Sequence, residues 1–458
     1  MTIAPERLTT VQSAPHSLMV DAGASTPRTN AIGGTTRTPR DRSIDTVRAA
    51  LLGIVVALHS TMVGVSIGAA GPVLENALEN QPWFAPVSWV VQIMPLFFIV
   101  GGFSSITHWR SLRAGNVSAA SYVRGRIDRL VRPAIAVVAV VGAALLTLTV
   151  MGVPADIVAT ASFRIGQPLW FLGVYILCSA MVPLMVRVHE RARVLTPALL
   201  AGAVIAVDVV RMATGIDVIG FANLLFVWLL VQQLGFWLAD GHIDALTRRT
   251  RVGILGAAFV TQVALTAGPY SADMLVNLNP PTLCLVVLGV AQLMIFSLLR
   301  PRIAVVADRP LVRRVADALG QRAMTVYLWH MPVLIALAAG LLVLNATAGV
   351  PLPEPLSPAW WVSRPLWLVV VGFAVVPVVR LFSRFERGRR MPRAAAPSLS
   401  PTPLSVTVDT VLGAAGVATA LILGFSAVPA MVSLALLLCA LGGTRRLRTI
   451  QIGALRWT

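Results

Sequence analysis

The stretch that decides the fold is Arg48-Ala-Ala-Leu-Leu-Gly-Ile-Val-Val-Ala-Leu-His59, within an apolar run from Thr46 to Gly68 that holds no other charged residue. Eleven residues at about 100° each return a helix to within roughly 20° of its starting azimuth and about 16 Å along its axis. Arg48 and His59 are therefore expected on one helix face, Arg48 at the mouth of a membrane span and His59 near its midplane. An ionisable group at that depth is costly unless it faces protein or water, so His59 is a functional-site hypothesis. A histidine that merely packs helices is the alternative.

The composition is that of a polytopic membrane protein. Of the 458 residues 57% are apolar and 12% are charged, whereas a soluble domain is about 25% charged. The net charge of +18 would suit nucleic-acid binding, but the basic residues lie in short loops rather than on one face, so we expect no nucleic-acid partner. All 37 basic residues are arginine, a composition that indicates GC-rich coding and predicts a high-GC bacterium as the source. Three separated cysteines favour neither a disulfide framework nor a zinc site.

Ten apolar segments are mostly close to the roughly 20 residues that a helix needs to cross a bilayer. They cover 46–68, 84–103, 131–152, 168–186, 195–211, 221–239, 251–268, 281–299, 323–346 and 360–382. Arginines crowd every second connection, at 104–132, 187–194, 240–251, 300–322 and 383–393, whereas the other connections together hold only Arg164. This bias predicts a multi-pass protein of the cytoplasmic membrane with its amino terminus in the cytoplasm. The expected fold is all-α, a polytopic transmembrane bundle with a ten-helix core.

The two ends of the chain are expected to differ from this core. The amino-terminal residues lack a periodic apolar pattern, which is typical of disorder. Near the other end, an apolar stretch interrupted by Pro429 is longer than one crossing requires and predicts one or two extra hydrophobic helices, with a tight hairpin favoured. We expect a disordered cytoplasmic tail at 1–42, a ten-helix membrane domain at 43–392, a linker at 393–410, an extra hydrophobic helix or hairpin at 411–442 and a basic tail at 443–458.

Two arginines in the loop after the second span are candidate phosphate ligands. Arg126 and Arg129 would share one helix face and present two guanidinium forks to a phosphate group. Contact with lipid headgroups is the alternative, and the spacing alone favours it. In the fifth span Asp208 and Arg211, three residues apart, are expected to pair with each other.

A second histidine opens the ninth span, in Tyr327-Leu-Trp-His-Met-Pro332, at a depth not far from that of His59. The two histidines would meet in one polar cavity as general base and partner. Alternatively, His330 would bond the backbone that Pro332 leaves free. No carboxylate is near in sequence, so a metal site is poorly supported. The chain has no nucleotide-binding loop and no hydrolase or zinc-protease motif.

Five blocks together resemble the acyltransferase 3 family of integral membrane acyltransferases, over roughly residues 42–390. The blocks are the Arg42-Asp45-Arg48-His59 constellation with its basic-x10-His spacing, Phe97-Phe-Ile-Val-Gly-Gly-Phe103, Arg126-Ile-Asp-Arg-Leu-Val-Arg-Pro133, Leu169-Trp-Phe-Leu172 and Tyr327-Leu-Trp-His-Met-Pro332. The second block has glycine at position 101 where the family has serine, which puts a hydroxyl role there in doubt. Residues 396–458 have no counterpart in the family core.

The resemblance implies an O-acyltransferase that moves an acyl group, by default acetyl, from cytoplasmic acyl-CoA to a hydroxyl of an envelope carbohydrate or glycolipid. Acyl-CoA would be a donor substrate, not a permanently bound cofactor. Arg126 and Arg129 would bind it, and Arg48 would stabilise a donor phosphate or orient the site. His59 would act as general base or as a transient acyl carrier.

Asp45 and His330 would support this site. A rival function is that of a secondary transporter or flippase, in which His59 and His330 would relay protons. Such transporters are commonly built from repeats, and the two halves of this sequence share no such pattern.

Overall fold

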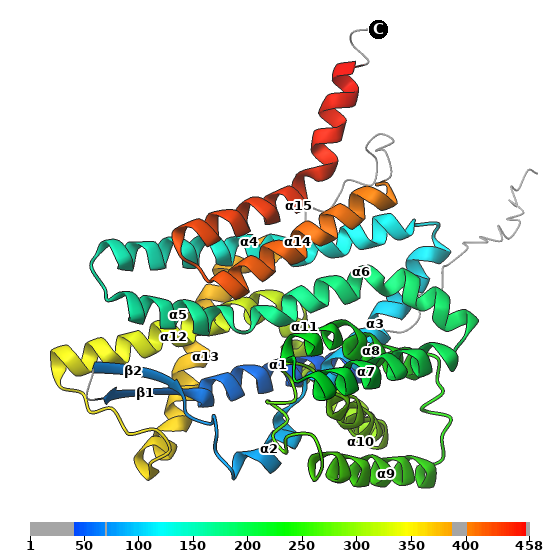
Figure 1. Cartoon of the computed structure of the whole chain (residues 1–458), viewed down its shortest axis with the longest axis horizontal. Helices are drawn as coiled ribbons and strands as arrows, with labels where there is room; N and C mark the ends of the chain where they lie inside the picture. Colours follow the sequence, from blue (N-terminus) through cyan, green and yellow to red (C-terminus); the bar gives the residue numbers. More distant parts are fainter. Residues whose placement is uncertain (1–40, 69–70, 387–400, 455–458) are drawn as a thin grey trace, which may run out of the picture. The chain divides into compact units, whose positions relative to one another are not determined.

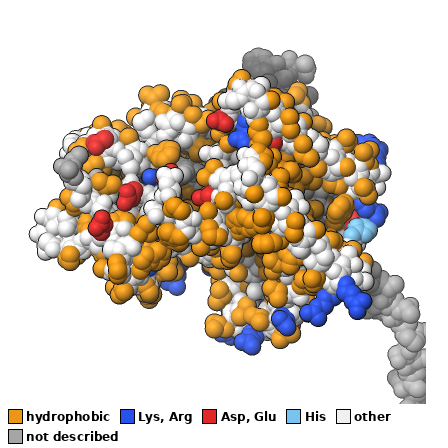
Figure 2. Space-filling view, turned by 60° about the horizontal axis from the view of Figure 1, so that its bottom comes forward, with side chains coloured by type: hydrophobic (Ala, Val, Ile, Leu, Met, Phe, Trp, Pro, Cys, Tyr) orange, Lys and Arg blue, Asp and Glu red, His pale blue; other side chains and the backbone are white. Residues whose placement is uncertain are grey.

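The computed structural model describes residues 41–68, 71–386 and 401–454. These residues form fifteen α-helices, one 3-10 helix and one two-stranded hairpin, and ten of the described helical segments are long and apolar enough to cross a membrane. Apolar side chains cover most of the face seen in Figure 2, as expected for a surface that meets lipid. The prediction of an all-α polytopic bundle with extra carboxy-terminal hydrophobic helices is confirmed.

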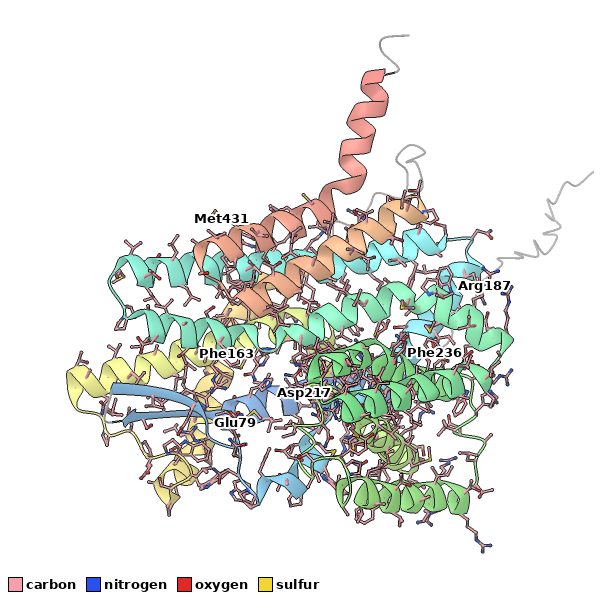
Figure 3. All side chains as sticks on the ribbon, in the orientation of Figure 1. Glu79, Phe163, Arg187, Asp217, Phe236 and Met431 are labelled. Carbon is pink, nitrogen blue, oxygen red and sulfur yellow. The ribbon has the colours of Figure 1, made fainter. Side chains whose placement is uncertain are left out.

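The helices follow the chain with short connections (Figure 1). They are α1 (Arg42–Met62), α2 (Phe84–Val91), α3 (Met94–Ala114), α4 (Ala119–Val150), α5 (Ala155–Gly166), α6 (Leu169–Arg191), α7 (Leu195–Thr214), the 3-10 helix η1 (Asp217–Ala222), α8 (Asn223–Ala239), α9 (Arg248–Thr266), α10 (Leu283–Ala307), α11 (Pro310–Gly320), α12 (Ala323–Ala348), α13 (Pro358–Glu386), α14 (Pro403–Leu423) and α15 (Ala427–Ala454). We call the end of the bundle that carries the arginine-dense connections the arginine-rich end. In Figure 3 Arg187 marks that end and Glu79 lies toward the opposite end.

Each predicted apolar segment overlaps a helix, but one of them is a weaker span than expected. The segment 251–268 lies on α9, which is not among the ten candidate spans of the described chain. Its first turn carries Arg248, Arg249 and Arg251, which lower its mean hydropathy. The tenth candidate span is instead α14, beyond the predicted core.

The predicted end of the first span, at residue 68 of the segment 46–68, is wrong. Helix α1 stops at Met62, and the chain continues as an antiparallel hairpin of β1 (Val63–Gly68) and β2 (Gly71–Asn76) in which Val63 faces Asn76. The sequence Val-Gly-Val-Ser-Ile-Gly alternates β-branched and small residues, a pattern that favours a strand over a helix. His59 therefore lies in the last turn of α1, not near the middle of a longer helix.

The start of α1 is fixed by its cap. The Asp41 carboxylate accepts hydrogen bonds from the backbone N–H groups of Ser43 at 2.9 Å and Ile44 at 3.4 Å, and it pairs with Arg300 of α10 at 2.5 Å. Burial raises the pKa of Asp41, but the hydrogen bonds from Ser43 and Arg300 outweigh it, so the pKa lies below its ordinary value. The helix that carries His59 is thereby tied to α10.

Helices α3 and α8 pack closely because glycines face their backbones. A Cβ atom on Gly102 would lie 2.5 Å from the carbonyl oxygen of Gln232, and one on Gly235 would lie 2.0 Å from that of Ile99. Gly102 therefore permits the close contact between these two helices. At Gly101 a Cβ atom would meet only the Tyr175 ring, at 3.9 Å.

The apolar stretch 411–442 lies on two helices, α14 and α15, which pack against α4 and α6 (Figure 1). Helix α14 begins at Pro403, so the end of the expected linker is helical. The buried Asp409 carboxylate pairs with Arg124 of α4 at 2.5 Å, which fastens this hairpin to the core. Helix α15 continues through much of the expected basic tail, to Ala454. The amino-terminal tail to residue 40, the linker residues 393–400 and the last four residues lie outside the described residues.

Candidate active site

A pair of histidines joins α1 to α12. His59 Nδ1 and His330 Nε2 are 2.8 Å apart, and the two rings are stacked with 5.0 Å between centroids and 10° between planes. His330 is fully buried, whereas His59 is partly exposed. The expected meeting of the two histidines is confirmed.

The partners of His330 decide which nitrogens carry protons. His330 Nδ1 lies 2.5 Å from the carbonyl oxygen of Tyr327, and because a carbonyl oxygen can only accept, Nδ1 must donate. In a neutral imidazole the other nitrogen is an acceptor, so His330 Nε2 accepts a hydrogen bond from the N–H group of His59 Nδ1. His59 Nε2 is left as an unprotonated nitrogen. The carbonyl used is that of Tyr327 and not that of Leu328, which Pro332 leaves free, so the alternative role expected for His330 is wrong.

His59 lines a small pocket at the end of the bundle opposite the arginine-rich end. The hairpin contributes Glu75 and Asn76, α5 contributes Arg164, and the connection from α5 to α6 contributes Gln167. The Nε atom of Arg164 is buried and has no hydrogen-bond partner among the described residues. These polar residues were not predicted as site residues, although Arg164 stood out as the single arginine in the connections of that side.

Tyr327 connects the histidine pair to two of the other sequence blocks. Its hydroxyl donates to the carbonyl oxygen of Pro168, at the start of α6. Its ring lies 5.0 Å from that of Phe171, which in turn lies 5.2 Å from Phe97 and 5.5 Å from Phe98 on α3. The blocks on α1, α3, α6 and α12 therefore meet around one group of aromatic rings.

The remaining block, Arg126 to Pro133 on α4, reaches the same aromatic rings from the arginine-rich end. Phe171 stacks on Tyr175 with 5.3 Å between the ring centroids. Tyr175 in turn lies close enough to Arg126 to interact electrostatically with its guanidinium group. The Arg126 guanidinium donates from Nε to the Tyr122 hydroxyl at 3.2 Å and lies 5.4 Å from the centre of that ring. A row of aromatic side chains thus runs from Arg126 to the histidine pair.

A family model described as an acyltransferase domain, that of the acyltransferase 3 family, matches residues 41–384, which contain all five blocks. The chain belongs to the acyltransferase 3 family. Comparison with curated proteins and with solved structures gave no match. Helices α14 and α15 lie beyond the matched residues of this acyltransferase.

The other predicted site residues of the acyltransferase lie away from the histidine pair. Arg126 and Arg129 lie in the first three turns of α4, and both are close to His108. Arg129 is exposed, and it makes no hydrogen bond or ion pair with any residue that the structure describes. Arg48 is likewise unpaired within the described part of the chain, and at 11 residues it is about 16 Å from His59 along α1. Asp45 lies in the first turn of the same helix.

No group of three or more histidine, cysteine, aspartate or glutamate side chains within the described ranges is placed to hold a metal ion. The expected pair of Asp208 and Arg211 is wrong. The buried Asp208 instead accepts from Asn223 at 2.9 Å and Tyr270 at 2.8 Å, and Arg211 pairs with Asp217 at 3.6 Å. Asp208 therefore fastens the loop before α10, away from the histidines.

A polar network at the arginine-rich end was missed by the sequence analysis. Arg110 of α3 pairs with Asp240 at 2.5 Å and with Glu190 at 3.0 Å, and the buried His189 reaches Asp240 at 3.1 Å. Burial raises the pKa of Asp240, but the hydrogen bonds from Arg110 and His189 outweigh it and hold the pKa below its ordinary value. The members are far apart in sequence and share no motif, so no local signal predicted the network. It joins α3, α6 and α8 beside the Arg126 region.

Proposed function

We propose that this acyltransferase transfers an acyl group, acetyl by default, from acyl-CoA to a hydroxyl of a carbohydrate or glycolipid, with His59 as general base. One observation carries the proposal. The hydrogen bonds from His59 to His330 and on to the Tyr327 carbonyl leave His59 Nε2 unprotonated, on a side chain that lines a polar pocket. A histidine that acts as a general base needs an unprotonated nitrogen, and a neighbouring group usually orients its ring.

The reaction follows from that arrangement. The acceptor hydroxyl would give its proton to His59 Nε2 as its oxygen attacks the thioester carbonyl carbon. The tetrahedral intermediate would then collapse, breaking the carbon–sulfur bond and releasing the CoA thiolate. The proton on Nε2 would pass to that sulfur, so the products are the ester and the free thiol. His330 would hold the protonated imidazole through its hydrogen bond.

The donor would enter at the arginine-rich end, which the charge bias predicts to be cytoplasmic. CoA carries several phosphate groups, and guanidinium groups are well suited to bind them. Arg126, Arg129 and Arg48 are the candidates, and the last two have no partner among the described side chains that a phosphate would have to displace. The aromatic row beyond Arg126 offers an apolar surface for the acyl-bearing arm.

The acceptor hydroxyl would enter the pocket that His59 shares with Glu75, Asn76, Arg164 and Gln167, whose volume of about 30 Å³ admits a group of that size. Carboxylate, amide and guanidinium groups supply both donors and acceptors, which suits a hydroxyl. The transporter alternative assigned proton relay to the same histidines, but membership in an acyltransferase family supports the enzyme.

The proposal is tested with the purified protein in detergent. Binding of acetyl-CoA is measured by calorimetry for the wild type, for Arg126→Ala/Arg129→Ala and for the control Arg248→Ala/Arg249→Ala, which removes the same charge from α9. We expect the wild type and the control to bind and the first variant to lose binding. If the wild type binds no acyl-CoA of any chain length, the proposed donor is wrong.

A further inference from the structure

An apolar groove that the proposed reaction does not use runs along the helix bundle. It lies between α1, α11, α12 and α13 and has a volume of about 610 Å³. Leu52, Gly53 and Val56 of α1 form one wall, and α13 forms the facing wall from Leu368 to Arg380. The thirteen residues from Leu368 to Arg380 make the α13 wall roughly 18 Å long, at about 1.5 Å for each of the twelve steps between them. One leaflet of a bilayer core of about 30 Å has a similar depth.

The groove opens toward lipid rather than toward protein. In the most apolar 18-residue stretch of each helix, 28% of the residues of α1 and 28% of those of α13 are buried inside the protein, compared with 61% for the segment that contains α8. Gly53 and Gly372 are both exposed in the groove, and a Cβ atom at either position would meet nothing within 4 Å. The two glycines therefore leave open space on facing helices within the membrane, where hydrocarbon chains are the material available to fill it.

The charges sit at one end of the groove. Arg322, just before α12, and Arg380 of α13 are the charged side chains among its described lining residues, none of which is a carboxylate. The guanidinium of Arg322 uses Nη1 to donate to the Ala318 carbonyl at 3.2 Å. That of Arg380 makes no hydrogen bond or ion pair with the residues from 41 to 386 and from 401 onward that the structure describes. Two cations at the arginine-rich end are thus open to an anion at headgroup depth.

Helix α11 forms the edge of this end of the groove through Ala318 and Leu319. It carries Arg313 and Arg314 beside exposed Leu311 and Val315. A short helix with basic and apolar side chains of this kind is typical of the membrane interface. The mouth of the groove therefore lies where phosphate headgroups are found.

We propose that the groove binds one anionic phospholipid of the leaflet at the arginine-rich end, with an acyl chain along α1 and α13 and its phosphate on Arg322 and Arg380. The lipid would complete the packing of α1, because Val56 and Ser60 line the groove while the neighbouring His59 lines its own pocket. The site is separate from the donor and acceptor sites proposed above, and its test does not depend on them.

The test uses the full chain purified in mild detergent and examined by native mass spectrometry. Phosphatidylglycerol and phosphatidylcholine are each added to delipidated protein, and thermal unfolding is followed in parallel. We expect the wild type to retain a phospholipid, to prefer phosphatidylglycerol and to unfold at a higher temperature with it, since a ligand that binds only the folded state stabilises it. Inorganic phosphate, which has no chain, should not reproduce the shift.

Two variants and two matched controls locate the site. Gly53→Leu/Gly372→Leu fills the groove, and Gly202→Leu/Gly256→Leu makes the same change at exposed, open positions of α7 and α9. Arg322→Gln/Arg380→Gln removes the charges, and Arg248→Gln/Arg249→Gln removes as many from α9. We expect the first variant to lose the bound lipid. We expect the arginine variant to bind phosphatidylglycerol about tenfold or more weakly than the wild type, and both controls to be unchanged.

Equal lipid retention by the filled groove and its control would overturn the proposal. So would an arginine variant that still prefers phosphatidylglycerol as the wild type does. If Gly53→Leu/Gly372→Leu does not give a monodisperse protein, the arginine variant and its control decide alone.

Discussion

His59 Nδ1 lies 2.8 Å from His330 Nε2, although 271 positions separate the two residues in the sequence. The other nitrogen of His330, Nδ1, donates a hydrogen bond to the Tyr327 carbonyl oxygen, so the position of the proton on each of the two rings is fixed. The ring nitrogen that is left unprotonated and without a hydrogen bond to the other ring is His59 Nε2, on the partly exposed ring. In the proposed mechanism His330 would hold the His59 imidazole in one tautomer and stabilise it once it is protonated.

His330→Leu is therefore expected to lower acyl transfer by roughly 100-fold or more, as other wrong-tautomer substitutions do. His330→Gln should retain more activity, because its amide can accept from His59 Nδ1 and donate to the Tyr327 carbonyl. Acyl-CoA affinity should be unchanged in both. The measurement is the initial rate at saturating donor, together with donor binding. Equal losses for leucine and glutamine would contradict the positioning role.

Arg126→Ala and Arg129→Ala are each expected to weaken acyl-CoA binding by about 10- to 100-fold, the range for a hydrogen bond to a charged group. High salt should also weaken the binding of acyl-CoA by the wild type. Salt should screen the contribution of the exposed Arg129 more strongly than that of Arg126, which is packed on Tyr122. Dissociation constants at low and high salt check both points. An affinity that neither substitution alters would exclude the pair from the donor site.

Gly101→Ser and Gly102→Ala should differ sharply although the positions are adjacent. A Cβ atom at 101 has only an ordinary contact with Tyr175 at 3.9 Å, whereas one at 102 would lie 2.5 Å from the Gln232 carbonyl oxygen. Overpacking of this kind costs about 1–3 kcal/mol. Thermal unfolding of the detergent-solubilised protein should show a clear loss for Gly102→Ala and little change for Gly101→Ser. The reverse order would contradict the close packing of α3 on α8.

The cap of α1 predicts a specific pH dependence. The pKa of Asp41 is held below its ordinary value of about 3.9, so the carboxylate contributes stability above about pH 4 and loses it as the pH falls through the lowered pKa. Asparagine also caps helices well, so Asp41→Asn removes chiefly the charge that pairs with Arg300. The difference in unfolding temperature between wild type and variant should be constant near neutral pH and shrink in acid. A difference that persists to the lowest pH at which the protein stays soluble would show that the charge is not responsible.

The sequence pattern predicted the helices well because apolar length and arginine bias are local properties. It could not predict where α1 ends. The run to Gly68 is apolar throughout, and the change from helix to strand at Val63 changes neither its hydropathy nor its charge. It also could not predict the pocket beside His59, because Glu75, Arg164 and Gln167 come from a hairpin, a short helix and a connection that meet only in the folded chain.

The meeting of the two histidines was predictable in kind but not in geometry. His59 is 17 residues from the start of α1 at Arg42, whereas His330 is 7 residues from the start of α12 at Ala323. The difference of 10 residues corresponds to about 15 Å of helix. The two histidines can meet because α11 packs beside α1, so that α12 begins at a point farther along α1. Such an offset depends on packing between helices, which a single sequence does not encode in any local pattern.

The most direct test of the account is acyl transfer by His59→Ala, with His242→Ala as a control for loss of a histidine elsewhere. Membranes that contain equal amounts of inserted protein are given acetyl-CoA labelled in the acetyl group, and label in the glycolipid and polysaccharide fractions is counted. The account predicts that His242→Ala transfers label like the wild type and that His59→Ala falls by at least about 100-fold, the lower range for loss of a general base. Transfer by His59→Ala at the wild-type rate would contradict the central claim.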